Sequence, residues 1–242
     1  MTTTFIIRGD NLQCNYRQTF TNIESFIKDL FRNEVHMAEH YYTSNPSVAH
    51  DEHTWTFPLF DHELTFTTDA GVFSKATIDF GTRTMLEAFD QDLPAGKILD
   101  LGAGYGPVAI SLATVMPDRE FVAAEINERA AQLVVRNAQA NHVDQQIDVV
   151  VSDRYNNVSG KFAAILTNPP VRAGKDIVSD MISGAKDHLV DGGTLTVVLQ
   201  KKQGAPSAKA LMTETFGNAA TIAKNKGYYI LESVYHADDT NA

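Results

Sequence analysis

Apolar residues in the second part of the chain follow two alternating patterns. Short runs that are apolar on both faces, as in buried strands, occur at 97–102, 120–125, 147–152, 162–168 and 193–200. Apolar residues at helical spacing lie between these runs, at 108–116, 127–143 and about 176–190. Asn127 is expected to cap the second of these helices. This alternation indicates a parallel sheet covered by helices on both faces.

The end of the chain breaks the alternation. Two strand-like runs, 219–225 and 227–234, are separated by Lys226 alone. So short a connection cannot cross over a sheet, so the two strands must form an antiparallel hairpin. We therefore predict a Rossmann-like α/β fold, in which a mostly parallel sheet ends in an antiparallel C-terminal hairpin.

The chain before Lys97 has a different pattern. Two alternating runs flank Asp61 and His62 and predict a small β-hairpin, and 77–89 is predicted to be a helix that enters the main domain. We therefore divide the chain into a lead-in region, 37–96, and a core, 97–242.

Residues 1–36 show little regular alternation of apolar and polar positions, and they contain one predicted amphipathic helix, from Ile23 to Phe31. We expect them to be an N-terminal extension, added by a start codon upstream of Met37. A genuine helical arm is the alternative. The intact mass of the natively expressed protein distinguishes the two, because a mass that includes these residues contradicts the start-codon hypothesis.

The composition narrows the functional classes. The single cysteine, Cys14, excludes an internal disulfide framework and a cysteine-based metal site, and it suits a reducing cytoplasm. Neither a secretion signal nor an apolar stretch of about 18 residues occurs, so a cytoplasmic protein without a membrane span is expected. No metal site is predicted.

The net charge of −10 is unevenly distributed: residues 1–160 carry −11, 161–226 carry +4 and 227–242 carry −3. The overall charge argues against a nucleic-acid partner. The locally basic region could nevertheless form a positive rim around a site that meets an anionic polymer. Ordinary solvated faces are the alternative explanation.

A glycine-rich loop joins the first core strand to the next helix. Gly102, Gly104 and Gly106 allow a tight turn and let a ligand approach the backbone and the free N–H groups of the helix. A dinucleotide fingerprint requires its third glycine at 107, where this chain has proline. Pro107 suits the first turn of a helix and argues against a nicotinamide cofactor.

Two acidic residues mark the carboxyl ends of the next two strands: Glu125 ends the second strand, and Asp153 follows the third. Glu125 can accept hydrogen bonds from both ribose hydroxyls of an adenosine, and Asp153 could accept from its adenine amino group. Each acid alone is most simply a solvated strand-end residue. Together with the glycine loop at one edge of a sheet, they indicate an adenosine without a pyrophosphate. That ligand points to S-adenosylmethionine.

The fourth core strand ends in Asn168, Pro169 and Pro170. Pro169 forces Asn168 into an extended conformation, and two prolines end the strand because they cannot donate hydrogen bonds. The rigid corner offers the carboxamide oxygen of Asn168 and a nearby carbonyl, most simply that of Pro169, as two acceptors for a planar exocyclic amine. A plain Pro-Pro turn is the alternative. The position of the corner beside the predicted cofactor favours catalysis.

These segments resemble the class I S-adenosylmethionine-dependent methyltransferases, and among them the "methyltransferase small domain" group. The likeness is greatest to short, single-domain relatives of the RsmC-like ribosomal RNA guanine-N2 methyltransferases. It rests on HYYTSNP, FTTDAGVFSK, DFGTRTMLEA, ILDLGAGYGP, ILTNPPVRAGK, LQKKQGAPSAK and GYYILES, which span about Met37 to Val234.

The resemblance implies a seven-stranded sheet of order 3-2-1-4-5-7-6 and methyl transfer to guanine N2 of small-subunit (16S) ribosomal RNA, free or in an assembling subunit. It assigns catalysis to Asn168, Pro169 and Pro170. It places S-adenosylmethionine against Phe73, Asp100, Gly102, Ala103, Gly104, Glu125, Ile126, Asp153 and Asn168. Phe73 would close over the methionine end, with core packing as the alternative.

Two departures from the family pattern affect the substrate. The larger RsmC enzymes carry a second, degenerate domain for substrate recognition, which nothing here is long enough to form. The family motif also places an aromatic residue after Pro-Pro, where this chain has Val171. Candidates for stacking on the target base are Tyr105, Phe80, Tyr228 and the guanidinium of Arg172. Arg172, Lys175, Lys201 and Lys202 are predicted to contact the substrate, the lysines through phosphates; each lysine could equally be an ordinary surface residue.

Three other functions remain open. The same corner could hold DNA adenine or a protein glutamine amide. A catalytically inactive module that binds the cofactor or RNA is a different class, against which the intact Asn168 argues. A nicotinamide-dependent dehydrogenase is disfavoured by Pro107 and the C-terminal hairpin. Fold alone does not separate these functions.

Overall fold

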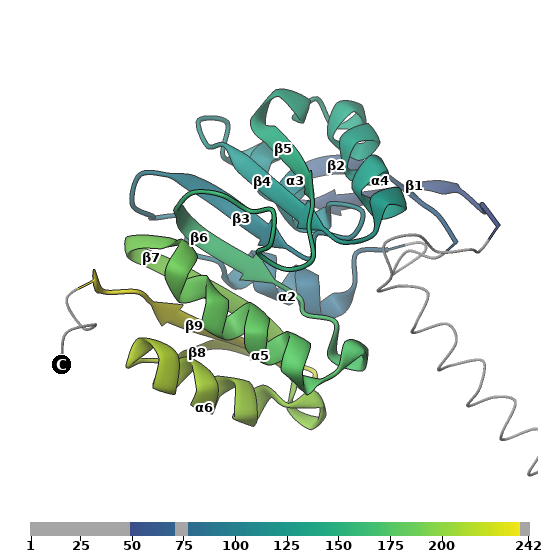
Figure 1. Cartoon of the computed structure of the whole chain (residues 1–242). Coiled ribbons are helices and arrows are strands. Elements are labelled where there is room, and N and C mark those ends of the chain that lie inside the picture. The colour runs from purple at the N-terminus through teal and green to yellow at the C-terminus, as the bar shows by residue number, and fades with distance from the viewer. Residues whose placement is uncertain (1–48, 71–76, 238–242) are drawn as a thin grey trace, which may run out of the picture. The chain divides into compact units, whose positions relative to one another are not determined.

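The protein is represented by a computed structural model that describes residues 49–70 and 77–237 (Figure 1). The predicted extension 1–36, with its helix from Ile23 to Phe31, and the predicted cofactor contact of Phe73 lie outside the described residues.

A seven-stranded sheet forms the centre of the domain (Figure 1). Its strands are β3 (Lys97–Leu101), β4 (Phe121–Glu125), β5 (Ile147–Val151), β6 (Phe162–Thr167), β7 (Leu189–Gln200), β8 (Ala220–Asn225) and β9 (Tyr228–Val234). They lie in the order β5-β4-β3-β6-β7-β9-β8; β3 to β7 are parallel, and β9 runs antiparallel to both of its neighbours. The predicted order and the C-terminal hairpin are confirmed.

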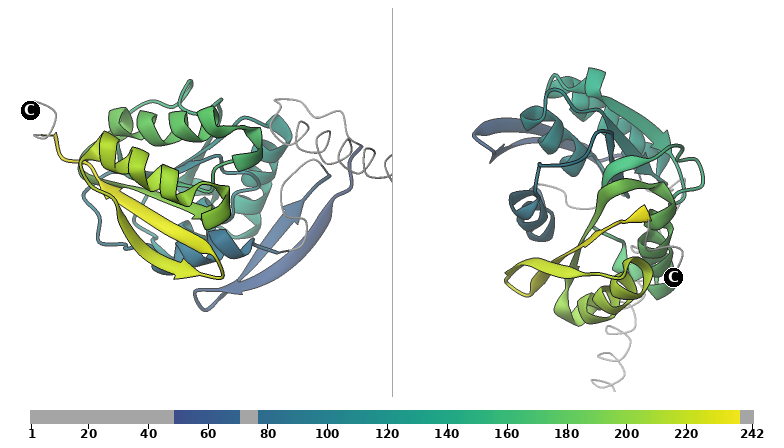
Figure 2. Two further views of the ribbon diagram at one scale, coloured as in Figure 1. Left: turned by 90° about the horizontal axis from the view of Figure 1, so that it is seen from below. Right: turned by 90° about the vertical axis from the view of Figure 1, so that its left-hand side faces the viewer.

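Helices cover both faces of this sheet. One buried apolar cluster packs α2 (Phe80–Ala88), α3 (Pro107–Val115) and α4 (Glu128–Ala140) against one face. A second cluster packs α5 (Lys175–Gly184) and α6 (Ala205–Phe216) against the other, as the two sides of the sheet in Figure 2 show. Short 3₁₀ turns are η1 (Asp144–Gln146), η2 (Val171–Ala173), η3 (Ala185–His188) and η4 (Lys201–Gln203). None of the helices in the described ranges is long and apolar enough to span a bilayer.

Helix α6 was not predicted. Its buried residues recur three or four positions apart, from Ala205 to Phe216, which is the spacing of one helical face. Gly204 and Gly217 bound it in the left-handed region, with φ of 108° and 74°. The two glycines were a usable signal for the ends of a short helix.

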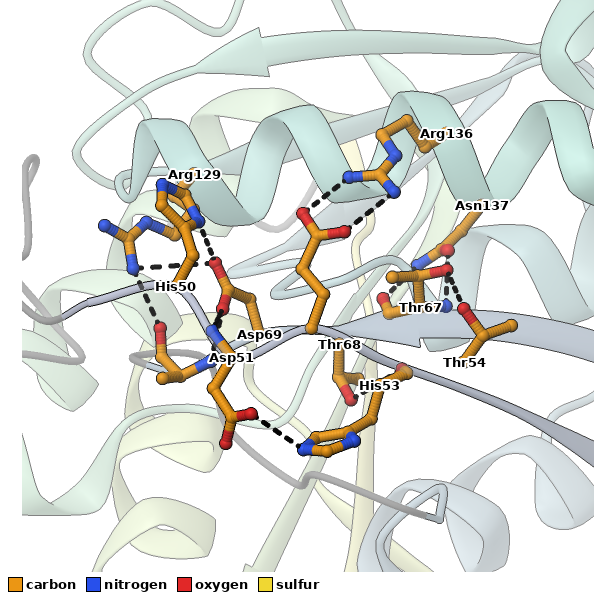
Figure 3. Close-up of polar contacts among 12 residues, drawn as sticks. His50, Asp51, His53, Thr54, Thr67, Thr68, Asp69, Arg129, Arg136 and Asn137 are labelled. Carbon is orange, nitrogen blue, oxygen red and sulfur yellow. Dashed lines mark hydrogen bonds and ion pairs between the residues drawn. The ribbon is translucent and has the colours of Figure 1, made fainter.

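The predicted N-terminal hairpin is confirmed as β1 (His53–Leu59) and β2 (His62–Thr68). Asn137 of α4 docks it: Oδ1 accepts from the Thr67 N–H at 2.7 Å and Nδ2 donates to the Thr67 carbonyl at 3.0 Å (Figure 3). Asn141, the C-cap of α4, makes the same pair of bonds with Thr65, at 2.9 and 2.7 Å. The two amides satisfy backbone groups along β2 much as a neighbouring strand would, and so fix the hairpin to the helix that follows Glu125.

Candidate active site

The carboxyl ends of β3, β4 and β6 bring the glycine loop, Glu125 and Asn168 to one edge of the sheet. These strands are parallel neighbours, with β3 between β4 and β6. In an open α/β sheet this edge is where ligands bind. The residues predicted to form the site from three separate motifs are therefore adjacent in the fold.

The glycines of the loop have different roles. All three have positive φ: 77° at Gly102, 58° at Gly104 and 92° at Gly106. A Cβ added at Gly104 would meet nothing within 4 Å, and one at Gly102 only the end of a methionine side chain at 3.5 Å. At Gly106 it would lie 2.9 Å from Ile110 and 3.0 Å from Val134. Gly102 and Gly104 therefore leave open space for a ligand, while Gly106 allows α3 to pack against α4.

Glu125 is held in place by main-chain donors. Its Oε2 accepts from the Gly104 N–H at 2.7 Å and its Oε1 from the Asn127 N–H at 2.9 Å. The side chain is buried, and desolvation raises its pKa although these N–H groups oppose the rise. The carboxylate is thus fixed beside the glycine loop, with lone pairs remaining for a ligand.

Asp100 lies in β3, and its Oδ2 accepts from the N–H of Ala109, in the first turn of α3, at 3.0 Å. Burial, with a further contribution from the charge of Glu125, raises the pKa of Asp100 to about 7. In the described contacts this carboxyl anchors the helix that the glycine loop opens. Its predicted contact with the cofactor stays a prediction.

Both carboxylate oxygens of Asp153 are engaged by Arg154. Nε of Arg154 lies 2.9 Å from Oδ1 and Nη2 lies 3.0 Å from Oδ2. Arg154 also pairs with Asp180. An adenine amino group would therefore share Asp153 with this guanidinium. Of the other predicted contacts, Ala103 is buried in the loop and Ile126 is half-buried beside Glu125.

Asn168 follows β6 and is oriented by α2. Its Nδ2 donates to Oδ2 of Asp79 and to Oγ1 of Thr82, each at 3.0 Å. Its Oδ1 has no hydrogen-bond partner among the described residues. The Pro169 carbonyl accepts from the Val171 N–H at 2.9 Å, which leaves one lone pair for a second donor. The corner therefore presents a free side-chain oxygen and a main-chain carbonyl.

The structure removes one candidate for stacking on a target base. Tyr105 is 2% exposed, and its ring packs against Trp55 and Phe66 with centroids 5.9 and 5.5 Å apart. The prediction that Tyr105 is available to a base is therefore wrong, because its ring belongs to the core. Val171 packs against the buried cluster of α5 and α6, so it serves the core as well.

The other two aromatic candidates form a pair beside Asn168. The rings of Phe80 and Tyr228 are both half-buried and lie 5.8 Å apart, and Phe80 directly follows Asp79. Gly81 makes room for this contact, since a Cβ there would lie 2.6 Å from the Tyr228 ring. The pair is thus placed next to the residues that orient the carboxamide.

A basic hollow lies beyond this aromatic pair. It has a volume of about 540 Å³ and is lined by Gln200, Lys201, Lys202, Pro206, Lys226 and Gly227. Lys226 Nζ lies 4.7 Å from the centre of the Phe80 ring, which links the hollow to the Asn168 corner. None of its lysines forms an ion pair with a described residue. Sequence reasoning found Lys201 and Lys202 but missed Lys226. Arg172 and Lys175 are exposed, on η2 and at the start of α5.

Three residues with metal-ligating atoms lie close together near the hairpin: His50, Glu52 and Asp69. Figure 3 shows Asp69 beside Arg129, and Glu52 also has a basic partner. Glu52 is paired with Arg136 at 2.7 and 3.0 Å, and Asp69 lies 3.5 Å from Arg129. These guanidinium groups favour an ion-pair cluster that ties the hairpin to α4.

Comparison with known proteins identifies similar chains. A family model described as "Methyltransferase small domain" matches residues 63–232. A Bacillus subtilis (strain 168) protein named "Uncharacterized protein YbxB" is 44% identical over 199 residues, which cover 81% of this chain and 98% of that protein. The "Ribosomal RNA small subunit methyltransferase C" of Pasteurella multocida is 35% identical over 164 residues, which cover 66% of this chain and 48% of that protein.

A solved structure has the same fold. It is that of the "T. Thermophilus 16S rRNA N2 G1207 methyltransferase (RsmC) in complex with AdoMet and Guanosine", with a TM-score of 0.69 and 25% identity. The match covers 76% of this chain and 51% of that one. The chain therefore spans about half the length of the methyltransferases it matches, and nearly all of the Bacillus protein.

Proposed function

Because the chain belongs to the methyltransferase small domain family, with S-adenosylmethionine as its cofactor, we propose that it methylates an exocyclic amine, namely guanine N2 of small-subunit ribosomal RNA. The free Oδ1 of Asn168, at the same edge of the sheet as the glycine loop, carries this proposal. The names of the Pasteurella and Thermus relatives support the choice of substrate.

The residues at the glycine loop fit this cofactor. The open space over Gly102 and Gly104 admits a ligand close to the backbone, and Glu125 offers a fixed carboxylate for the ribose hydroxyls. Ala103, Ile126 and Asp153 lie around the same edge. When bound, S-adenosylmethionine supplies an electrophilic methyl group on a sulfonium.

Asn168 is placed to make the target amine a better nucleophile. An exocyclic amine of guanine is a poor nucleophile, because its lone pair is delocalised into the ring. Two acceptors, Oδ1 of Asn168 and the carbonyl of Pro169, can hold both N–H bonds so that the nitrogen pyramidalises and aims its lone pair outward. The amine proton becomes acidic as the N–C bond forms, so no strong base is needed. Positioning therefore supplies most of the rate enhancement.

The basic hollow supports an RNA substrate. Lys201, Lys202 and Lys226 gather beside Phe80 without acidic partners in the described structure. Lysines of this kind bind phosphates, and half-buried aromatic rings can stack on an unpaired base. We assign the three lysines to phosphate contacts, the pair of Phe80 and Tyr228 to the target base, and Arg172 and Lys175 to the outer substrate surface.

The test is transfer of labelled methyl from S-adenosylmethionine to small ribosomal subunits and to free total RNA, followed by nucleoside mass spectrometry. The wild type should produce N2-methylguanosine, and Asn168→Ala should lower the rate by at least about 100-fold. Gln139→Ala, which removes an exposed carboxamide at the end of α4 far from Glu125, is the matched control and should retain wild-type activity.

Other outcomes would overturn specific parts of the proposal. Full activity of Asn168→Ala would remove Asn168 from catalysis. Label in DNA or in protein instead of RNA would favour adenine or a glutamine amide as the target. Cofactor binding without transfer to RNA, DNA or protein would identify an inactive module.

A further inference from the structure

The orientation of the Asn168 carboxamide depends on a short chain of hydrogen bonds. Asn168 Nδ2 donates to Thr82 Oγ1 and to Asp79 Oδ2, each at 3.0 Å, and the Thr82 hydroxyl donates to the same Oδ2. Thr82 is 3% exposed, and Asp79 and Asn168 are half-buried. These bonds are therefore largely shielded from water. In such surroundings a donor or acceptor that faces the wrong kind of partner destabilises the arrangement.

The direction of donation in this chain is fixed at one end. A carboxylate accepts hydrogen bonds and has no proton to give, so Asp79 must face donors. The Thr82 hydroxyl has a single proton, which it gives to Asp79, so it can only accept from Asn168. Both neighbours therefore require the NH₂ group of the carboxamide, although an amide turned by 180° would occupy nearly the same volume.

Asp79 is itself held rigidly. It is the N-cap of α2, where its Oδ1 accepts from the Gly81 N–H at 2.8 Å, and the Thr82 N–H lies 3.3 Å from each of its oxygens. The Tyr228 ring closes against Gly81 and leaves no room for a side chain there. The carboxylate cannot turn away from Asn168 without breaking the cap.

We propose that Asp79 and Thr82 are positioning residues that keep the oxygen of Asn168 facing the substrate, so that the corner accepts an N–H donor and rejects a carbonyl. This rests on the proposed function, because it concerns how the same site selects an amine. Sequence reasoning did not find either residue in this role, since they lie 89 and 86 positions before Asn168.

Three substitutions separate positioning from folding. Asp79→Asn keeps a good N-cap but adds an NH₂ group that competes for the Asn168 oxygen, so kcat should fall by about 100-fold. Thr82→Val should lower kcat by about 10-fold, because Asp79 still accepts from Asn168, and Thr82→Ser should recover most of that loss. KM for RNA and the affinity for S-adenosylmethionine should stay within about twofold of wild type in all three variants.

Thr84→Val is the matched control on the same helix. It removes a threonine hydroxyl that donates to the Phe80 carbonyl at 2.8 Å and that has no contact with Asn168. If Thr84→Val lowers kcat as much as Thr82→Val does, the effect of Thr82 is one of helix packing and the proposal fails.

A double variant tests the direction of the hydrogen bonds. In Asp79→Asn combined with Asn168→Asp, the new amide donates and the new carboxylate accepts from both the amide and the target amine. The exchange conserves shape and net charge, so kcat should recover at least about 10-fold relative to Asp79→Asn alone. Activity of the double variant at or below that of the single variant would overturn the proposal.

A measurement without any substrate separates this inference from the proposed function. In wild type the side-chain NH₂ protons of Asn168, seen by ¹⁵N NMR, should exchange with water at least about 10-fold more slowly than in Thr82→Val. Equal exchange rates overturn the positioning role, whatever the activity. Slow exchange together with a wild type that transfers no methyl to RNA would keep the positioning and reject the proposed function.

Discussion

The cofactor side and the target side of the site lie at the same edge of the sheet but are held in opposite ways. On the cofactor side, Glu125 accepts from the main-chain N–H groups of Gly104 and Asn127. On the target side, Asn168 is held by the side chains of Asp79 and Thr82. A site fixed by the main chain depends mainly on local sequence, whereas one fixed by side chains depends on how distant elements pack.

The two sides also differ in charge and exposure. The cofactor side contains the buried acids Asp100 and Glu125, whose pKa values are raised by burial. The target side opens into exposed lysines, Lys201 and Lys202, without ion pairs among the described residues. Buried acceptors held in fixed positions suit a small cofactor, and an open basic surface suits a polyanion whose position varies.

The largest effect is expected for Asp100, at the base of the cofactor side. Burial raises its pKa from 3.8 to about 7, so between these values the folded protein keeps a proton that the unfolded chain has released. Stability is therefore present at low pH and is lost as the pH rises through this window. Asp100→Asn removes this titration.

Urea unfolding at pH 4.5 and 7.5 measures this difference. Between the two pH values the wild type should lose about 3 kcal/mol more unfolding free energy than Asp100→Asn. The comparison removes the titration of groups that do not interact with Asp100, whereas the contribution of the Glu125 charge to the raised pKa of Asp100 belongs to the measured difference. Equal losses in wild type and variant would show that Asp100 is not buried as described, and would weaken the contrast between the two sides.

Substitution of Glu125 tests whether the cofactor binds on the side of the site that is held by main-chain N–H groups. Glu125→Ala removes the carboxylate acceptor and leaves the Gly104 N–H unpaired, so the affinity for S-adenosylmethionine should fall by about 100-fold, or about 3 kcal/mol. Glu125→Gln, which keeps one acceptor oxygen, should lie between this variant and wild type. Titration calorimetry measures both, and unchanged affinity in Glu125→Ala would remove Glu125 from the cofactor site.

The same contrast explains which parts of the fold the sequence could predict. The strand order came from the family resemblance. The core strands are continuous apolar runs and the last two are joined by a very short link, so the parallel sheet and the hairpin followed from pattern. The start of β7 did not: the predicted strand began at Gly193, but the structure begins it at Leu189, which pairs with Phe162 across the sheet. Asp191 and Gly192 resemble a turn in sequence, and the chain is irregular there: Gly192 has a φ of 75° and the register with β6 shifts before Thr194, so only the pairing of Leu189 shows that the strand begins earlier.

Prediction of the site followed the same division. Gly102, Gly104 and Glu125 could be found because each is placed by the strand it follows. Tyr105 was misplaced, because position in a glycine loop does not reveal that a ring turns into the core. Asp79 and Lys226 were missed as partners of the site, because their roles arise from contacts between elements far apart in the chain.

The smallest expected effect concerns single lysines of the basic hollow, where binding is shared among several charges. Lys201→Ala, Lys202→Ala and Lys226→Ala should each weaken RNA binding by about 1 kcal/mol and reduce the slope of log K against log salt by about 1. Lys161→Ala, at the opposite end of β6, removes the same charge away from the site and is the matched control. Filter binding across a salt series measures all four. An equal loss in the control would mean that RNA responds to total charge, and the hollow would then no longer distinguish the target side from the rest of the surface.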